Sequence, residues 1–244
     1  MSIFDLSGRI AVVTGASRGI GLAIASGLRD SGAIVIGIAR SSGLKDIGYQ
    51  YRICDVTNPI LFKKNIEEIY SDYGHIDILV NAAGITMPSG LNEKPSLLFQ
   101  DTIQTNLTAV FECCSAVFPF MRMGGFGSII NVSSIGAMFG FPGNPAYIAS
   151  KGGVSALTRA LAIDYGVSGV RVNNLVPGYI RTSMTQKSFD NPHLRAAREG
   201  RTILGRFGEA NELAGAAIFL SSDASSYITG IDLVVDGGWK AKGL

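Results

Sequence analysis

Residues that bind metal ions or form disulfides are scarce in this sequence of 244 residues. It holds two histidines and three cysteines, and no His/Cys/Asp cluster has the spacing of a metal site. The cysteines, Cys54, Cys113 and Cys114, form no even disulfide set, so reduced thiols in a cytoplasmic protein are the simplest interpretation. We therefore expect neither a metal site nor a disulfide framework.

Charged residues are also few, and no block of Lys and Arg interrupts the chain. They make up 16% of the sequence, with a formal net charge of +2, so neither nucleic acid nor an acidic membrane is supported as the main partner. No apolar run reaches the ~18 residues of a membrane-spanning helix. The start, MSIFDLSGRI, has no basic segment followed by an apolar one. We expect a soluble cytoplasmic protein with a small-molecule substrate.

The shortage of histidine also argues against a serine hydrolase. A nucleophilic serine needs a histidine base that is held by a carboxylate. His75 precedes the strand-like stretch IDILV and His193 lies in a polar loop, and neither context matches a hydrolase triad. We expect surface or turn positions for both.

Apolar residues, by contrast, make up 47% of the chain and occur in short β-branched runs that alternate with longer amphipathic segments. This alternation predicts an α/β fold, doubly wound, with a mainly parallel seven-stranded sheet and helices on both faces, in a single domain over residues 1–244. Strands are predicted at 10–14, 33–39, 51–56, 76–81, 128–133, 170–176 and 231–236. Helices are predicted at about 19–31, 58–73, 96–123, 146–166 and 209–221. The polar, Arg-rich stretch at about 180–206 is longer than a simple connection, which favours a substrate lid.

The stretch TGASRGIG (14–21) lies where the first predicted strand meets the first helix. Glycines at this point let a dinucleotide pyrophosphate approach the backbone and rest on the helix N-terminus. A site that selects NAD usually has an acidic residue at the end of the second strand, but Ala39 occupies that place and Arg40 follows it. Arg18 and Arg40 suit a 2'-phosphate, which predicts NADP(H) as the preferred cofactor, with NAD(H) as the alternative. The competing interpretation is that both arginines are solvated surface charges.

The stretch PAYIASKGG (145–153) places Tyr147 and Lys151 four positions apart, on one face of a predicted helix. An isolated pair of this kind is usually a packed tyrosine beside a lysine that extends to water. A cation near a phenol, however, stabilises the phenolate and lowers the pKa of the tyrosine. The surrounding motifs favour this second interpretation.

The sequence resembles the short-chain dehydrogenases/reductases of about 250 residues, and the resemblance spans nearly the whole chain. It rests on TGASRGIG (14–21), DV (55–56), NAAG (81–84), QTNL (104–107), Ser134 thirteen residues before Tyr147, Lys151, PGYIRT (177–182) and VDGG (235–238). The chain departs from the family at Ala82, where a second asparagine is common. The resemblance implies a Rossmann-type fold and an enzyme that interconverts a ketone and a secondary alcohol with NADP(H) or NAD(H).

The same resemblance implies a catalytic set. Tyr147 is the general acid in ketone reduction, and Lys151 both tunes it and binds the nicotinamide ribose. Ser134 donates a hydrogen bond to the substrate carbonyl, and Asn106 holds a water that relays protons. Ser133 competes for the role of Ser134, and the family spacing to Tyr147 selects Ser134. The residues implied at the cofactor are Gly15, Ser17, Arg18, Gly19, Ile20, Gly21, Arg40, Asp55, Val56, Asn81, Ala83, Gly84, Tyr147, Lys151, Pro177, Gly178, Ile180 and Thr182.

The substrate is less constrained, because the sequence is similar both to members that act on sugar acids and to members that reduce 3-oxoacyl chains on a carrier protein. Carrier proteins are acidic, and reductases that serve them tend to have basic residues where this chain has Ser128 and Ser168. We therefore favour a small polar or sugar-acid-like ketone. Arg195, Arg198 and Arg201 in the lid form a basic patch or bind a small carboxylate.

Two further expectations follow from the resemblance. Family members of this size commonly form homotetramers or homodimers through the long helices, here at 96–123 and 146–166. A catalytically silent dinucleotide-binding regulator is the alternative to an enzyme, and loss of Ser134, Tyr147 or Lys151 would have favoured it. All three are present.

Overall fold

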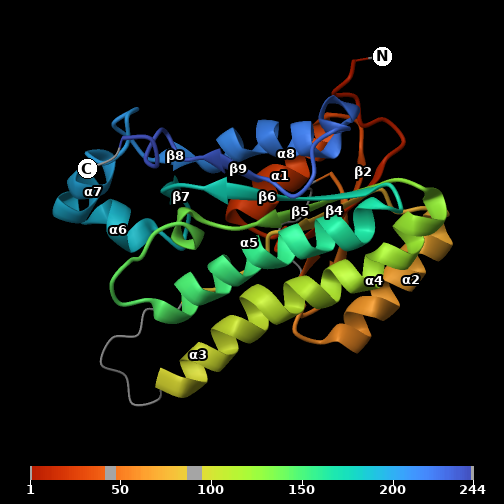
Figure 1. Ribbon diagram of the computed structural model, residues 1–244, viewed down its shortest axis with the longest axis horizontal. Coiled ribbons are helices and arrows are strands. Elements are labelled where there is room, and N and C mark those ends of the chain that lie inside the picture. The colour runs from red at the N-terminus through yellow and green to blue at the C-terminus, as the bar shows by residue number, and fades with distance from the viewer. Residues whose placement is uncertain (1, 42–47, 87–94, 243–244) are drawn as a thin grey trace.

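The structure is a computed structural model that describes residues 2–41, 48–86 and 95–242 (Figure 1). Residues 42–43 of the SSG stretch after Arg40 and residues 243–244 at the end of the predicted domain lie outside the described residues.

Seven parallel strands form one sheet in the order β3-β2-β1-β4-β5-β6-β9. The strands are β1 (Ile10–Thr14), β2 (Ile34–Ala39), β3 (Gln50–Ile53), β4 (Ile78–Asn81), β5 (Gly127–Val132), β6 (Val170–Pro177) and β9 (Asp232–Val235). All seven predicted strands are confirmed, with boundaries shifted by at most three residues. The strand order reverses between β1 and β4, and ligands of such sheets bind beyond the carboxyl ends of the strands at this point.

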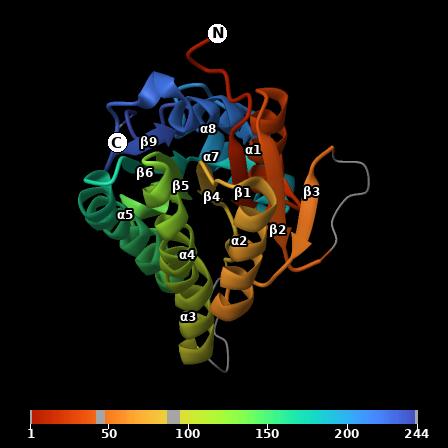
Figure 2. The same ribbon diagram turned by 90° about the vertical axis from the view of Figure 1, so that its right-hand side faces the viewer.

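Helices cover both faces of the sheet, which makes three layers (Figure 2). One face is covered by α1 (Gly19–Asp30) and α8 (Ala214–Ser221), and the other by α2 (Pro59–Tyr73), α4 (Ala109–Gly124) and α5 (Pro145–Gly166). Successive strand side chains alternate between the two cores, so Val12 packs under α2 and α4 while Val13 packs under α1 and α8. The predicted doubly wound architecture is therefore confirmed.

Local sequence signals set several helix boundaries. Asn58 begins α2 because its side chain accepts a hydrogen bond from the Leu61 backbone, 3.0 Å away, and Pro59 occupies the first turn. Gly74 ends the helix with φ 79°, a left-handed conformation that favours glycine. Pro145 likewise opens α5, the helix that carries Tyr147 and Lys151.

Two predicted helices are interrupted. The segment 96–123 forms α3 (Pro95–Ile103), a π-helical turn (Gln104–Thr108) and α4. Such wide turns occur mostly at functional sites, and this one contains Asn106. The segment 209–221 begins with a 3₁₀ turn (Ala210–Leu213) before α8. The prediction of unbroken helices is wrong at both places.

The predicted lid contains β7 (Ile180–Arg181), α6 (Gln186–Asp190) and α7 (Pro192–Glu199). β7 pairs with β8 (Gly208–Glu209) in a small second sheet. In Figure 1 this segment lies at one end of the molecule, beyond the carboxyl end of β6. No helix among the residues described above is long and apolar enough to cross a membrane.

Candidate active site

The turn between β1 and α1 is closed by backbone contacts that leave no room for a side chain at Gly15 or Gly21. Gly15 and Gly19 have φ values of 68° and 56°, which favour glycine. A Cβ on Gly21 would lie 2.3 Å from the Gly15 carbonyl oxygen, and one on Gly15 would lie 2.7 Å from the Ala83 nitrogen. The turn therefore presents bare backbone at the start of α1, which fits a dinucleotide pyrophosphate.

The turn after β4 is bonded to this first turn. Thr14 Oγ1 accepts hydrogen bonds from the backbone nitrogens of Ala82 and Ala83, at 3.1 and 3.2 Å. The backbone at the departure from the family pattern is therefore satisfied without a second asparagine. Gly84 follows, and a Cβ there would lie 3.3 Å from Asn106 Oδ1 and 3.9 Å from Lys151 Nζ.

The family resemblance implies that Asn81 lies at the cofactor, but the structure directs its side chain elsewhere. Its side chain is buried and donates to Asn131 Oδ1 at 2.9 Å and to Cys114 Sγ at 3.3 Å. As the last residue of β4 it points into the layer between the sheet and α4, because strand side chains alternate between faces. Only its backbone faces the crevice.

The adenosine end of the predicted cofactor site is open. Arg18 and Arg40 are exposed, and neither forms an ion pair within the part of the chain that the structure describes. Asp55 Oδ1 accepts from the backbone nitrogen and hydroxyl of Thr57, at 2.9 and 2.8 Å, which fixes the carboxylate after β3. Val56 is buried beside it, and Ser17 and Ile20 in the first turn are partly exposed.

Ser134, Tyr147 and Lys151 converge at the carboxyl end of β5. Lys151 Nζ is buried, donates to the Val132 carbonyl at 2.7 Å and lies 5.8 Å from the centre of the Tyr147 ring. Ser134 caps a short turn by accepting from the Gly136 nitrogen at 3.0 Å, and it hydrogen-bonds the Tyr147 phenol.

Ser133, the competing serine, points elsewhere. Its hydroxyl donates to the Lys151 carbonyl at 3.3 Å and lies 3.3 Å from Ser155 Oγ, in the buried layer beneath α5. This geometry favours Ser134 as the hydroxyl that faces a substrate.

The electrostatics of the pair differ from the sequence prediction that Lys151 lowers the pKa of Tyr147. Burial is the largest influence and raises the pKa of the Tyr147 phenol above its usual 10, while the hydrogen bond with Ser134 lowers it in part. Burial also lowers the pKa of Lys151 from 10.5 to about 8. The prediction is wrong because desolvation by burial is the largest influence on the pKa values of both Tyr147 and Lys151. Tyr147 consequently keeps its proton at neutral pH, as a general acid requires.

The π-helical turn positions Asn106 against the segment that follows β4. Its side chain exchanges two hydrogen bonds with the backbone of Ile85, both 2.8 Å long, and donates to Ser150 Oγ at 3.2 Å. It is fully buried. Asn106 thereby joins the segment after β4 to α5.

The loop after β6 closes over the first turn. A Cβ on Gly178 would lie 2.7 Å from Asp236 Cα, so the loop packs tightly against the end of β9. The Thr182 methyl group lies 3.5 Å from the position of a Cβ on Gly19. Pro177 and Ile180 are buried, so only the backbone of Ile180 is available to a ligand. The structure thus brings the predicted phosphate turn and the predicted nicotinamide loop together.

Four aromatic side chains beside Ser134 were missed by the sequence reasoning: Phe139, Phe141, Tyr179 and Trp239, here called the aromatic wall. The Trp239 ring lies 4.8 Å from Phe139 and 5.8 Å from Phe141, and Tyr179 lies 6.2 Å from Phe141. The wall packs against Ile135, the residue after Ser134. No periodicity in the sequence links the four positions.

A backbone phosphate turn beside a Ser, Tyr and Lys set, at the carboxyl edge of a parallel sheet, defines a dinucleotide-dependent oxidoreductase. The family model described as enoyl-(acyl carrier protein) reductase matches residues 15–240. Gluconate 5-dehydrogenase of Gluconobacter oxydans is 40% identical over 97% of this chain and 96% of its own. The chain belongs to the short-chain dehydrogenase/reductase family, and its gluconate 5-dehydrogenase and 3-oxoacyl reductase relatives act on CH–OH or ketone groups.

Two other relatives cover nearly the whole chain. The 3-oxoacyl-acyl-carrier-protein reductase of Haemophilus influenzae is 39% identical over 96% of this chain and 98% of its own. The crystal structure of a gluconate 5-dehydrogenase from Burkholderia cenocepacia, in complex with NADP and tartrate, has a TM-score of 0.92 and 34% identity, and covers 98% of this chain and 97% of its own. These relatives therefore fall into the two substrate classes that the sequence left open, namely sugar acids and 3-oxoacyl chains on a carrier protein.

Burial of Lys151 yields a prediction for stability. The folded-state pKa of about 8 lies below the unfolded value near 10.5, so the buried cation costs up to about 3 kcal/mol below pH 8. Lys151→Met is expected to be more stable than the wild type at pH 7, and the difference should shrink as the pH rises from 8 to 10.5. Denaturant unfolding at a series of pH values measures it. Lys63→Met, at an exposed site, should show no such trend, and a pH-independent difference for Lys151→Met would contradict the prediction.

Proposed function

We propose that the protein is an NADP(H)-dependent oxidoreductase that interconverts a ketone and a secondary alcohol on a small polar, sugar-acid-like substrate. The observation that carries the proposal is the meeting of Ser134, Tyr147 and Lys151 at the carboxyl end of β5, beside the bare glycine turn. A silent binding protein has no need of a buried, desolvated ammonium group beside a protonated phenol.

The site residues divide the chemistry of carbonyl reduction. The nicotinamide cofactor supplies the hydride, or accepts it in the reverse direction. Tyr147 donates the proton to the substrate oxygen, and Ser134 donates a hydrogen bond to the same oxygen as negative charge develops there. The Gly136 nitrogen uses only an acceptor site of Ser134, so the hydroxyl proton, which hydrogen-bonds the Tyr147 phenol here, can turn to the substrate oxygen.

Lys151 is suited to hold the ribose. An ammonium group has three donors, and one is used by the Val132 carbonyl, which leaves two for the hydroxyls of the nicotinamide ribose. Both N–H groups of the Asn106 carboxamide are taken by Ile85 and Ser150, so the relay water proposed for Asn106 would bind the second acceptor site of its Oδ1, beside Gly84.

Cofactor choice should depend on residue 40. Solved relatives contain NADP, and the exposed guanidiniums of Arg18 and Arg40 are suited to its 2'-phosphate. Arg40→Asp is expected to shift the ratio of kcat/KM for NADPH over NADH by at least ~10-fold toward NADH, most strongly at low salt. Arg52→Gln, which removes an arginine paired with Glu68 and Asp72, should leave the ratio unchanged. A wild type that already prefers NADH would contradict this assignment.

One sequence argument about the substrate does not hold. Ser128 is fully buried, and its hydroxyl donates to the Leu220 carbonyl at 2.7 Å beneath α8. A residue enclosed in this way says nothing about a docking partner, so only the partly exposed Ser168 remains of that argument. Support for a sugar-acid substrate comes instead from the gluconate-dehydrogenase relatives and from tartrate, a hydroxy dicarboxylate, in one of their structures.

The second candidate is a 3-oxoacyl-acyl-carrier-protein reductase, which relatives of equal similarity favour. The two are separated by kcat/KM for keto-gluconates and for 3-oxoacyl carrier protein, each at low and moderate salt. We expect the keto-gluconates to be preferred. A strong, salt-sensitive preference for the carrier-bound substrate would overturn the sugar-acid proposal, because an acidic carrier associates by electrostatic steering.

A further inference from the structure

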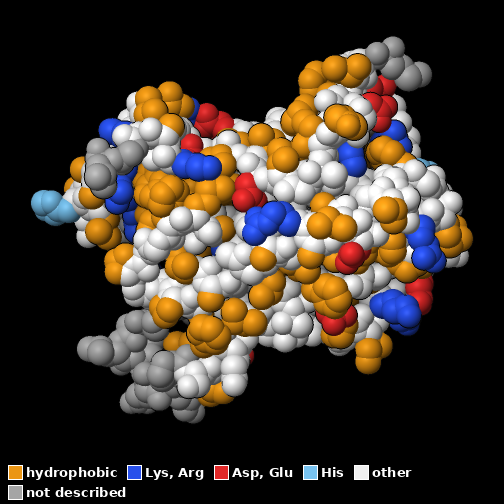
Figure 3. All heavy atoms as spheres, viewed as in Figure 1, with side chains coloured by type: hydrophobic (Ala, Val, Ile, Leu, Met, Phe, Trp, Pro, Cys, Tyr) orange, Lys and Arg blue, Asp and Glu red, His pale blue; other side chains and the backbone are white. Residues whose placement is uncertain are grey.

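The lid segment is far more basic than the rest of the chain. Between Tyr179 and Phe207 the sequence has six Lys or Arg and two Asp or Glu, whereas the whole chain has a net charge of only +2. Lys and Arg side chains surround an apolar surface at the end of the molecule where α6 and α7 lie (Figure 3). The rest of the chain is therefore slightly acidic, and the net positive charge of the protein lies in the lid segment.

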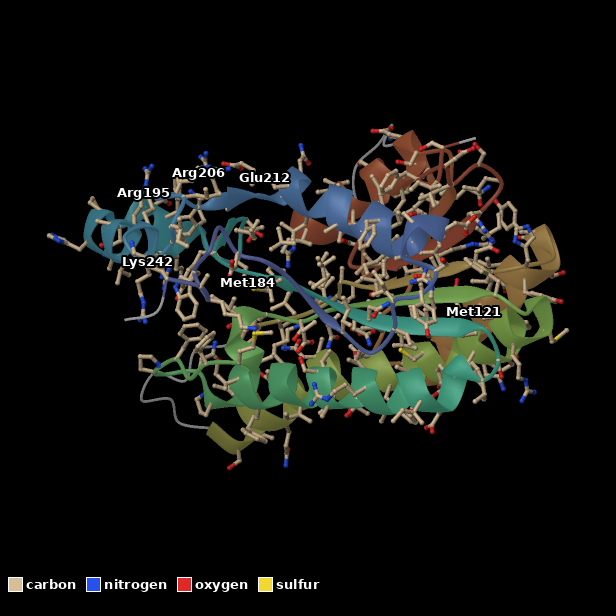
Figure 4. All side chains as sticks on the ribbon, turned by 45° about the horizontal axis from the view of Figure 1, so that its top comes forward. Met121, Met184, Arg195, Arg206, Glu212 and Lys242 are labelled. Atoms are coloured by element: carbon tan, nitrogen blue, oxygen red, sulfur yellow. The ribbon has the colours of Figure 1, made fainter. Side chains whose placement is uncertain are left out.

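Some of these cations are neutralised within the protein. Arg195 pairs with Glu199 at 2.9 Å, and Arg206 pairs with Glu212 at 2.7 Å in a two-pronged contact (Figure 4). Arg198 lies on the same helix as Arg195 but has no such partner in the part of the chain that the structure describes.

Arg198 and Arg201 rest on aromatic rings instead of carboxylates. The Arg198 guanidinium carbon lies 4.8 Å from the centre of the Tyr179 ring, and that of Arg201 lies 4.9 Å from the centre of the Trp239 ring. Neither side chain has an ion pair or hydrogen bond within residues 2–41, 48–86 and 95–242. Stacking uses the face of a guanidinium and leaves its in-plane N–H groups free, and these groups match both oxygens of a carboxylate.

The two rings under these arginines, Tyr179 and Trp239, belong to the aromatic wall, which begins beside Ser134. A Cβ on Gly136 would lie 3.4 Å from Ser134 Oγ and 3.6 Å from the Phe141 ring. Phe141 contacts both Tyr179 and Trp239. The aromatic wall therefore runs continuously from the neighbourhood of Ser134 to the two rings on which the guanidiniums lie.

We infer that Arg198 and Arg201 bind the carboxylate of the substrate and thereby select keto acids and hydroxy acids over neutral ketones. The inference rests on the proposed function, since it names the group that the same pocket recognises. Among the described residues, Arg181, Arg198 and Arg201 of the lid lack carboxylate partners, whereas Arg195 and Arg206 have them. Arg181 lies over Phe189, which is outside the aromatic wall.

Steady-state kinetics test the inference with two substrates of similar size, 5-ketogluconate and the neutral ketose fructose. We expect the wild type to prefer the acid. Arg198→Gln and Arg201→Gln combined should raise KM for the acid by at least ~10²-fold, with kcat changed by less than ~3-fold and with fructose kinetics unaltered. Arg52→Gln, which removes an arginine that is paired with Glu68 and Asp72 outside the lid, is the control and should change KM for the acid by less than ~3-fold.

Binding provides a second readout that does not depend on turnover. Trp239 is the single tryptophan of the chain, and Arg201 lies over its ring. Titration of the NADP-loaded wild type with gluconate should change the tryptophan emission, and the double variant should show no saturable change at the same concentrations.

The possible outcomes distinguish failure of the carboxylate site from failure of the proposed function. Equal losses for acid and ketose in the double variant, or a wild type that does not prefer the acid, would overturn the carboxylate site while the reductase activity stands. Absence of turnover with every ketone, together with gluconate binding that the double variant loses, would leave the site in place and overturn the proposed function. Absence of both turnover and gluconate binding would overturn both.

Discussion

Replacing Tyr147 with Phe is expected to lower kcat for ketone reduction by at least ~10²-fold and to leave the fold intact. The phenol is the proton donor of the site, and burial keeps it protonated at neutral pH. Phenylalanine keeps the ring and its packing but has no proton to give. The measurement is kcat with saturating NADPH and ketone, alongside the Kd for NADPH, which should change by less than ~3-fold because Lys151 remains.

Tyr227→Phe is the matched control for this change. Tyr227 is fully exposed and distant in sequence from the catalytic set, so its hydroxyl should be dispensable. A Tyr147→Phe variant with near-normal kcat would refute the assignment of the general acid. A variant with normal kcat but weakened NADPH binding would instead place the phenol at the cofactor alone.

The second large effect is expected from Gly21→Ala. A Cβ at this position would lie 2.3 Å from the Gly15 carbonyl oxygen and 2.8 Å from the Gly15 carbonyl carbon. Both are backbone atoms that cannot turn aside as a side chain can, so the turn must move. Displacement of a binding group by about 1 Å can cost ~10² in binding or rate, and we expect the Kd for NADPH to rise by at least that factor. Titration of NADPH fluorescence measures it.

Gly215→Ala is the control for a glycine in a helix. No described residue outside the helix backbone lies within 4 Å of the place that its Cβ would take on α8, so alanine should raise the free energy of unfolding by ~0.5–1 kcal/mol and leave NADPH binding unchanged. Unaltered NADPH affinity in Gly21→Ala would show that the turn does not hold the pyrophosphate.

Much of the fold follows from local patterns in the sequence. The runs at β1 and β6 are buried along their whole length, and β1 consists almost entirely of β-branched residues, which is typical of parallel strands inside a sheet. The spacing of Tyr147 and Lys151 needs only an ordinary helix to bring both to one face, and α5 is one. Their meeting with Ser134 is seen in the structure, and the roles of all three remain predictions.

The features that escaped the sequence depend on contacts between distant segments. The π-helical turn exists where Asn106 bonds the backbone of Ile85, a contact that no local propensity encodes. Desolvation sets the pKa values of Tyr147 and Lys151, and burial is a property of the folded chain. The aromatic wall joins four positions between 139 and 239, which only the tertiary structure brings together.

The central claim is that this site transfers reducing equivalents from NADPH to a ketone. The most direct test incubates the purified protein with NADPH and a panel of ketones that includes keto-gluconates, and measures NADPH loss and alcohol formation together. We predict that at least one keto acid is converted to the alcohol with one NADPH consumed for each alcohol formed, and that Tyr147→Phe loses both signals. Tight NADPH binding with no alcohol formed from any ketone would contradict the account and identify a dinucleotide-binding regulator instead.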